Sequence, residues 1–300
     1  MPGAWPQPPW QPTRAPQSAV SSLPSSPASS SSSQPLAPYG FSFSAGGLLF
    51  SYYIGIAAGL RDAGVLLPET PVAGASAGSL IAACCKSGLS TDTIVAAFDD
   101  LALDCRTNGT RLRLGPVLER VLTYALPKDI HTRCEGVLHV AVTRVFPDYG
   151  PLTISSFSSK QDVINTLLTS CHIPFFFNGN LVCAYRDAHY YDGGLTQFLP
   201  KPPASRVINV CCFPSANMRG AGGSIDISPD TFEPWPYTTR QMLAWAFEPA
   251  PEEILVMLTA KGRRDAMAWA EAQGGLAGLL SADQAGSKVR SEVASHTLLR

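Results

Sequence analysis

One serine in the chain stands where it can serve as a nucleophile. Residues 74–78 read Gly-Ala-Ser-Ala-Gly, a G-x-S-x-G pentapeptide between a short apolar run and a stretch of helix-forming residues. This order predicts a nucleophile elbow, a strained strand-to-helix turn that lifts the hydroxyl of Ser76 above a sheet. Gly74 and Gly78 leave space where a side chain would collide with the neighbouring strand or helix. The helix that follows aims its free N–H groups at the reacting atom.

A serine that attacks an ester also needs hydrogen-bond donors for the carbonyl oxygen that becomes negative. Residues 44–47 read Ser-Ala-Gly-Gly and connect a predicted strand to a predicted helix. Backbone approaches a substrate most closely at glycine, so we predict that Gly46 and Gly47 supply the oxyanion donors. A phosphate site is the other use of such a turn, but the sequence lacks the Gly-Lys-Ser/Thr of a P-loop.

The proton of the serine must go to a base. The best candidate is Asp192, because Asp192-Gly193-Gly194 follows two tyrosines at the end of a predicted strand, where the sites of open α/β sheets gather. The residue pattern leaves histidine open as well, and the chain has five: His131, His139, His172, His189 and His296.

Taken in order, these pieces resemble the patatin-like phospholipase family, and most of all its adiponutrin-type lipid hydrolases. The matching segments are 44–47 (SAGG), 52–57 (YYIGIA), 74–78 (GASAG), 170–174 (SCHIP) and 191–194 (YDGG), so the resemblance covers about residues 39–199. It implies an α/β fold of the patatin-like three-layer type, with a mostly parallel central sheet flanked by helices. It also implies a Ser–Asp dyad without histidine, in which Ser76 is the nucleophile and Asp192 the base.

The glycine loop departs from the family pattern, which reads G-G-G-x-R/K-G or G-x-G-x-x-G. Ala45 stands in place of the first glycine, Leu49 in place of the basic residue and Phe50 in place of the last glycine. The two central glycines are kept, so we expect the oxyanion donors to be intact. The missing cation removes an anchor for a phosphate or carboxylate and favours a neutral lipid or a head group that is held elsewhere.

The elements that must position these residues alternate in type. Strand, glycine turn, helix, strand, serine turn and helix follow one another from Tyr39 to Gly88, as in a parallel sheet with helices on its faces. Apolar periodicity predicts further helices over 91–103, 115–124, 160–169, 239–247 and 251–273. It predicts strands over 137–146, 152–154, 181–185, 189–191 and 206–213, the last of them central.

Three regions follow from composition. Residues 1–38 are rich in serine and proline and are predicted to be disordered. Residues 39–213 form the predicted patatin-like catalytic domain. Residues 214–300 are predicted to form a loop and C-terminal helices that pack on that domain or extend it.

Charge and cysteine usage exclude several classes of function. The formal net charge of −1 gives no basis for binding nucleic acid, and the spacing of the eight cysteines does not match a zinc site. We therefore predict no metal and no cofactor, and a lipid at a membrane or lipid-droplet surface as the partner. Apolar neighbours around the cysteines favour buried thiols in a reducing, intracellular compartment. A plastid or mitochondrion is the alternative if residues 1–38 are a transit peptide.

Three other functions remain open at this point. A conventional triad would use an aspartate and His296, and predicts an inactive His296→Ala variant. A transacylase would pass the acyl group to another lipid with the same residues. A lipid-binding or scaffold protein with little turnover would keep the fold and dock by an apolar surface, for which 175–177 (Phe-Phe-Phe) is a candidate unless this run is buried.

Overall fold

The computed structural model describes residues 36–218 and 223–281. Its sheet contains β1 (Ala37–Phe43), β2 (Val72–Ala75), β3 (Leu138–Phe146), β4 (Gly150–Ile154), β5 (Cys183–Tyr185), β6 (Ala188–Asp192) and β7 (Ala204–Val210). The strands pair in the order β5-β6-β3-β2-β1-β7, and β4 pairs with β3. The run from β3 to β7 is parallel, whereas β4, β5 and β6 are antiparallel to their partners. Apart from its last three residues, the region predicted to be disordered lies outside the described residues.

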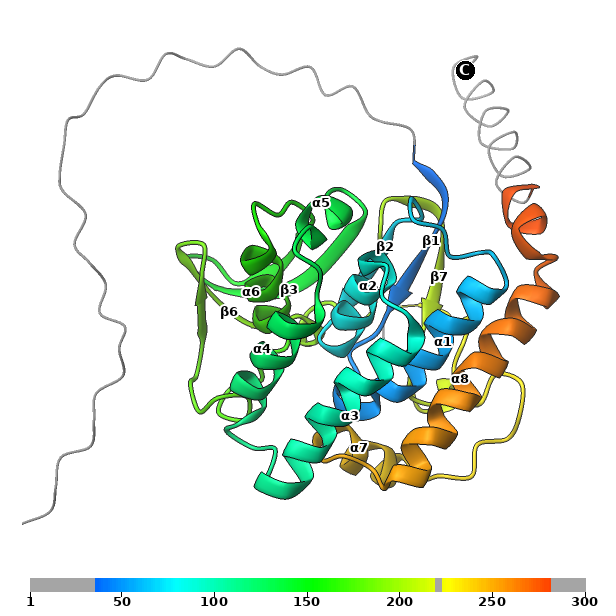
Figure 1. The fold of residues 1–300 in the computed structure, drawn as a ribbon. Coiled ribbons are helices and arrows are strands. Elements are labelled where there is room, and N and C mark those ends of the chain that lie inside the picture. Colours follow the sequence, from blue (N-terminus) through cyan, green and yellow to red (C-terminus); the bar gives the residue numbers. More distant parts are fainter. Residues whose placement is uncertain (1–35, 219–222, 282–300) are drawn as a thin grey trace, which may run out of the picture. The chain divides into compact units, whose positions relative to one another are not determined.

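Helices flank this sheet (Figure 1). In chain order they are α1 (Phe50–Asp62), α2 (Ala77–Ser87), α3 (Thr91–Asn108), α4 (Leu114–Ala125), α5 (Ile130–Cys134), α6 (Lys160–Ser170), α7 (Thr239–Phe247) and α8 (Glu252–Ala272). Short 3₁₀ turns lie at η1 (Gly47–Leu49), η2 (Gly193–Leu195) and η3 (Ser215–Asn217). The predicted α/β class with a mostly parallel sheet is confirmed.

Strand β3 is long enough to pair with two strands along one edge. Ala141 pairs with Ala75 of β2 and also with Thr153 of β4, so β2 and β4 lie on opposite edges. The next residue, Val142, pairs with Asp192 of β6 and with Leu152 of β4, so β6 lies on the same edge as β2. Strands β2 and β6 therefore run toward each other along β3, and both end at Ala141–Val142.

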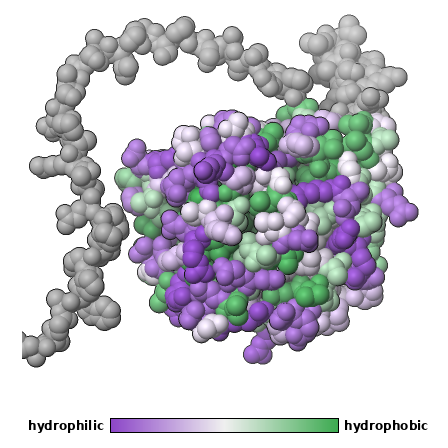
Figure 2. Space-filling view, in the orientation of Figure 1, coloured by the Kyte–Doolittle hydropathy of each residue, from purple (hydrophilic) through white to green (hydrophobic). Residues whose placement is uncertain are grey.

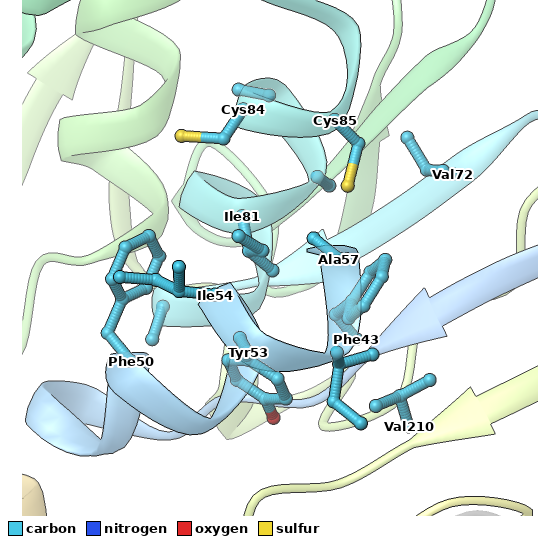
Figure 3. Close-up of a cluster of buried hydrophobic side chains, with 14 of the residues drawn as sticks. Phe43, Phe50, Tyr53, Ile54, Ala57, Val72, Ile81, Cys84, Cys85 and Val210 are labelled. Carbon is cyan, nitrogen blue, oxygen red and sulfur yellow. The ribbon is translucent and has the colours of Figure 1, made fainter. Parts of the chain in front are cut away.

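The helices α1, α2 and α8 lie side by side on one face of the sheet (Figure 1). The connections from β1 to β2 and from β2 to β3 step in the same direction, so right-handed crossovers put α1 and α2 on the same face. Edge-to-face contacts of Phe43 with Tyr53 and of Phe41 with Trp269 hold α1 and α8 against β1. Figure 3 shows how the side chains of α1, α2, β1 and β7 meet in this core.

Three elements differ from the prediction. Strand β7 was expected to be central, but it lies at the edge of the sheet and pairs only with β1 among the named strands. Its apolar C-terminal half is nevertheless buried, since residues 226–227 add hydrogen bonds to its open edge. The helix α3 continues five residues beyond the expected Leu103, and α5 was not expected at all. The Ser90 side chain caps the start of α3, and Gly88, in a left-handed conformation, ends α2.

On the face shown in Figure 2, apolar residues reach the surface in patches between polar ones. In the described residues, no helix is long and apolar enough to cross a bilayer.

The close packing of α8 on α1 depends on glycine. A Cβ added at Gly262 would lie 2.1 Å from the carbonyl oxygen of Tyr52. Gly262→Ala should therefore lower the free energy of unfolding by about 1–3 kcal/mol or more, although alanine favours helix. Gly150→Ala is the control, because nothing lies within 4 Å of its added Cβ. Urea unfolding measures the free energy of unfolding of both variants. If Gly262→Ala is as stable as Gly150→Ala, the close contact between α8 and α1 is refuted.

Candidate active site

Ser76 lies on the tight turn between β2 and α2. Its backbone angles, φ 53° and ψ −126°, are strained for a residue with a side chain. The hydroxyl of Ser170 accepts the Ser76 N–H at 2.9 Å and donates to the carbonyl of Ala141 at 2.7 Å, which ties the turn to β3. A Cβ at Gly74 would lie 2.1 Å from the Gly78 carbonyl oxygen, so the flanking glycine is a steric requirement, as the sequence predicts.

Asp192 ends β6 next to this turn. The Asp192 N–H donates to the carbonyl of His172, and the Asp192 carbonyl accepts the hydroxyl of Thr143, both at 2.8 Å. One carboxylate oxygen, Oδ1, accepts the Gly194 N–H at 2.7 Å. The other, Oδ2, is buried and has no hydrogen-bond partner among residues 36–218 and 223–281. Burial raises the pKa of the Asp192 carboxyl to about 6, against smaller opposing effects of Ser76 and the Gly194 N–H.

The glycine after Asp192 is as tightly placed as those beside the serine. A Cβ at Gly193 would lie 2.0 Å from the Ala141 carbonyl oxygen, and one at Gly194 would lie 2.6 Å from the Ala45 Cβ. The Asp-Gly-Gly turn thus packs against both β3 and the loop that follows β1.

That loop carries Gly46 and Gly47. Gly47 has φ +54°, a conformation that favours glycine, and a Cβ there would lie 2.0 Å from the Ala246 carbonyl oxygen of α7. Gly47 is the first residue of η1, so its N–H has no partner within the helix. No hydrogen bond within the described part of the chain uses the N–H of either glycine.

A buried phenol fixes the position of this loop. The Tyr53 hydroxyl lies 2.6 Å from the Ser44 hydroxyl, donates to the Ser44 carbonyl at 2.9 Å, and accepts the Cys212 N–H at 3.2 Å. It thereby joins the ends of β1 and β7 beneath the glycines. Tyr53 belongs to the 52–57 segment of the resemblance, but nothing in the sequence indicated this role.

One cavity brings the predicted residues together. The cavity has a volume of about 1000 Å³, including its open mouth, and is lined by Ser76, Asp192, Gly46, Gly47 and Gly194. Asp192 is the only charged residue among its described lining. None of the four described histidines lines the cavity, and His296 lies outside the described residues. No cluster of three or more metal-ligand side chains occurs within the described segments.

Comparison with known proteins agrees with this geometry. The profile of the Patatin-like phospholipase family matches residues 41–204, more than half of the chain. The chain belongs to this family.

Relatives within the patatin-like phospholipases differ in their reactions. Human patatin-like phospholipase domain-containing protein 4 is 31% identical over 63% of this chain and 74% of its own length. Human omega-hydroxyceramide transacylase is 31% identical over 55% of this chain, but the match spans only 32% of that protein. Human 1-acylglycerol-3-phosphate O-acyltransferase PNPLA3 is 29% identical, and its match spans 58% of this chain and 37% of that protein.

Among solved structures, VipD from Legionella pneumophila has a similar fold. Its TM-score is 0.50 at 12% identity, and the match covers 79% of this chain and 67% of VipD.

The positions that depart from the patatin-like pattern are apolar for a structural reason. Leu49 is completely buried, and Phe50 packs on Phe98 with ring centroids 5.4 Å apart. A cation at position 49 would be buried, which costs free energy unless the charge is paired, so an apolar residue suits this position.

The raised pKa of Asp192 has a consequence for stability. A carboxyl with a pKa of about 6 in the folded protein and an ordinary pKa of 3.8 binds its proton more tightly when folded, so its contribution to stability is lost as the pH rises from about 4 to 6. Asp192→Asn removes the buried charge and should raise the free energy of unfolding at pH 8 by about 1–3 kcal/mol. The gain should disappear near pH 4. Urea unfolding of wild type and Asp192→Asn at the two pH values measures the difference in their free energies of unfolding. A difference that is no larger at pH 8 than at pH 4 contradicts the prediction.

Proposed function

We propose that the chain is a serine acyl hydrolase that cleaves fatty-acyl esters of neutral lipids through a dyad of Ser76 and Asp192. Family membership supports an activity on lipid acyl groups, either hydrolase or acyltransferase. The observation that carries the finer proposal is the meeting of β2 and β6 on consecutive residues of β3, which sets the strained serine beside a buried carboxylate with a free oxygen.

Each step has a group in the cavity to perform it. Asp192 accepts the Ser76 proton as Oγ attacks the ester carbonyl, and the N–H groups of Gly46 and Gly47 hold the oxyanion. The alcohol leaves with the proton from Asp192, which gives an acyl-serine. Water then attacks the acyl-serine and Asp192 accepts its proton; the fatty acid is released as Asp192 passes that proton to the Ser76 oxygen. With a pKa of about 6, Asp192 is ionised at neutral pH and is a stronger base than an exposed aspartate.

The cavity favours an uncharged substrate. Apart from Asp192, its described lining offers no ionisable group to hold a phosphate or an amine. Triacylglycerol and the acyl ends of membrane glycerolipids fit such a lining. Comparing fatty-acid release from triacylglycerol, galactolipid and phospholipid identifies the class.

A transacylase is the second candidate. Two apolar cavities meet at Ser76, which gives room for a second lipid where a hydrolase needs only water. This reaction begins with the same acyl-serine and ends with an alcohol of the second lipid in place of water.

Removal of either dyad member should abolish turnover. We expect Ser76→Ala and Asp192→Asn to lose about 10³-fold or more in kcat on nitrophenyl butyrate, since the nucleophile and its base act as a unit. A fluorophosphonate probe should label wild type at Ser76 and leave Ser76→Ala unlabelled.

Asp187→Asn is the matched control, because Asp187 is exposed in the turn between β5 and β6 and asparagine tolerates its φ of 59°. Wild-type turnover in Ser76→Ala or Asp192→Asn rules out the dyad. If the wild-type protein neither hydrolyses the ester nor reacts with the fluorophosphonate probe, the result supports the alternative of a lipid-binding or scaffold protein. Adding a lipid alcohol to the assay distinguishes the two possible activities, because a transacylase forms a new ester with the alcohol and a hydrolase releases the fatty acid.

Five large apolar side chains at or near the mouth of the cavity are exposed, and we call them the apolar rim: Leu195, Leu243 and Phe247, which line the cavity, and Leu112 and Phe175, which lie outside its lining and next to Phe176. The Leu112 N–H donates to the Phe176 carbonyl, and Phe176 packs on Phe247, which connects the segments of Leu112 and Phe175 to a residue that lines the cavity. Leu112 and Phe175 have φ of 68° and 60°, so strained backbone holds two apolar side chains in water. Of the Phe-Phe-Phe run, Phe175 is exposed and Phe177 is buried. We propose that the rim contacts the lipid surface.

The double variant Leu112→Asn/Phe175→Asn tests this contact. Asparagine tolerates both backbone conformations, so the fold should persist while binding to triacylglycerol emulsions coated with phosphatidylcholine falls about tenfold or more. Turnover of soluble nitrophenyl butyrate should not change. Tyr124→Asn, on the exposed side of α4, is the control. Emulsion flotation measures binding, and undiminished binding of the double variant excludes the rim.

A further inference from the structure

A second cavity leads away from Ser76 into the helical layer. It shares Gly47, Ser76, Ile173 and Ala246 with the first cavity and has a volume of about 860 Å³ that includes its opening. None of the described residues that line it is charged, and nearly all of them are apolar. Protein interiors are close-packed, so an apolar opening that begins at a nucleophile and is lined without charge is suited to the apolar part of a ligand.

The cavity follows α2 from its first residue. Ala77, Leu80 and Cys84 line it at helical spacing, so one face of α2 forms its wall. The facing wall comes from α3 and from α4, whose lining residues run from Leu114 to Ala125. At 1.5 Å per residue, Cys84 lies about 12 Å along the helix axis from Ser76.

Small side chains keep the far half of the cavity open. Cys84 lines it from α2. The Gly115 N–H near the start of α4 donates to the Phe177 carbonyl, close to the site, so Ala125 at the other end of α4 lines the far half, beside larger residues such as Leu122 and Leu126. Figure 3 shows the Cys84 and Cys85 side chains leaving α2 in different directions, and only Cys84 lines the cavity. Burial raises the pKa of the Cys84 thiol to about 12, so the thiol stays uncharged and acts as a small apolar group.

We infer that this second cavity holds the acyl chain of the ester that Ser76 attacks, and that Cys84 and Ala125 set the chain length it accepts. The inference rests on the proposed function. A saturated chain advances about 1.25 Å per carbon, given carbon–carbon bonds of about 1.5 Å, so about ten carbons reach Cys84. Longer chains continue past Cys84 and Ala125, whereas a butyryl chain ends well before them. The remainder of the lipid occupies the first cavity.

Filling the far half tests the inference. Cys84→Phe and Ala125→Phe obstruct it from opposite walls, and each should reduce kcat/KM on nitrophenyl palmitate about tenfold or more relative to nitrophenyl butyrate. Butyrate turnover in each variant reports that the enzyme is folded and that its dyad is intact. Cys84→Ala is the matched control, because it widens the cavity and should leave the palmitate-to-butyrate ratio at or above that of wild type.

The outcomes separate this inference from the proposed function. A wild-type protein without activity on either ester overturns both. Normal activity with an unchanged palmitate-to-butyrate ratio in Cys84→Phe and Ala125→Phe overturns only the acyl-chain assignment. A fall in the ratio in either variant, without one in Cys84→Ala, supports it.

Discussion

The site depends on the pairing of one strand with two others at a single point. Ala75 pairs with Ala141, and Asp192 pairs with the next residue, Val142. These contacts bring together Ser76 and Asp192, which are far apart in sequence, without a direct bond between their side chains. The Ala141 carbonyl also accepts the Ser170 hydroxyl, which in turn holds the Ser76 N–H. A shift of β6 by one residue would turn Asp192 to the opposite face of the sheet, so the register must be kept.

Close backbone approach around this point explains the glycines. Gly74, Gly78 and Gly193 each face a carbonyl within about 2.2 Å of where a Cβ would lie. The strand ends can converge only if those positions carry no side chain. The strained Ser76 and the buried Asp192 oppose stability, and the surrounding hydrogen bonds and the core of α1, α2 and α8 must offset that cost.

The same arrangement divides the proposed lipid site into two parts. Ser76 lies where the first cavity, under the apolar rim, meets the second cavity along α2. The absence of charge from the described linings, apart from Asp192, makes both parts suitable for uncharged chains. Burial of Leu49 and Phe50, where the family carries a basic residue and a glycine, belongs to the same apolar character.

The sequence by itself determined the local features of this protein. G-x-S-x-G, Gly46-Gly47 and Asp-Gly-Gly have conformational and steric causes that act over a few residues, and apolar periodicity located most helices and strands within a few positions. It misjudged β7, because burial of an edge strand by residues 226–227 gives the same apolar pattern as a central position. Only the tertiary structure decided that Asp192 meets Ser76, that Tyr53 and Ser170 support the site, and that a second cavity opens beside α2. Those facts follow from strand order and packing between distant segments, which no local pattern encodes.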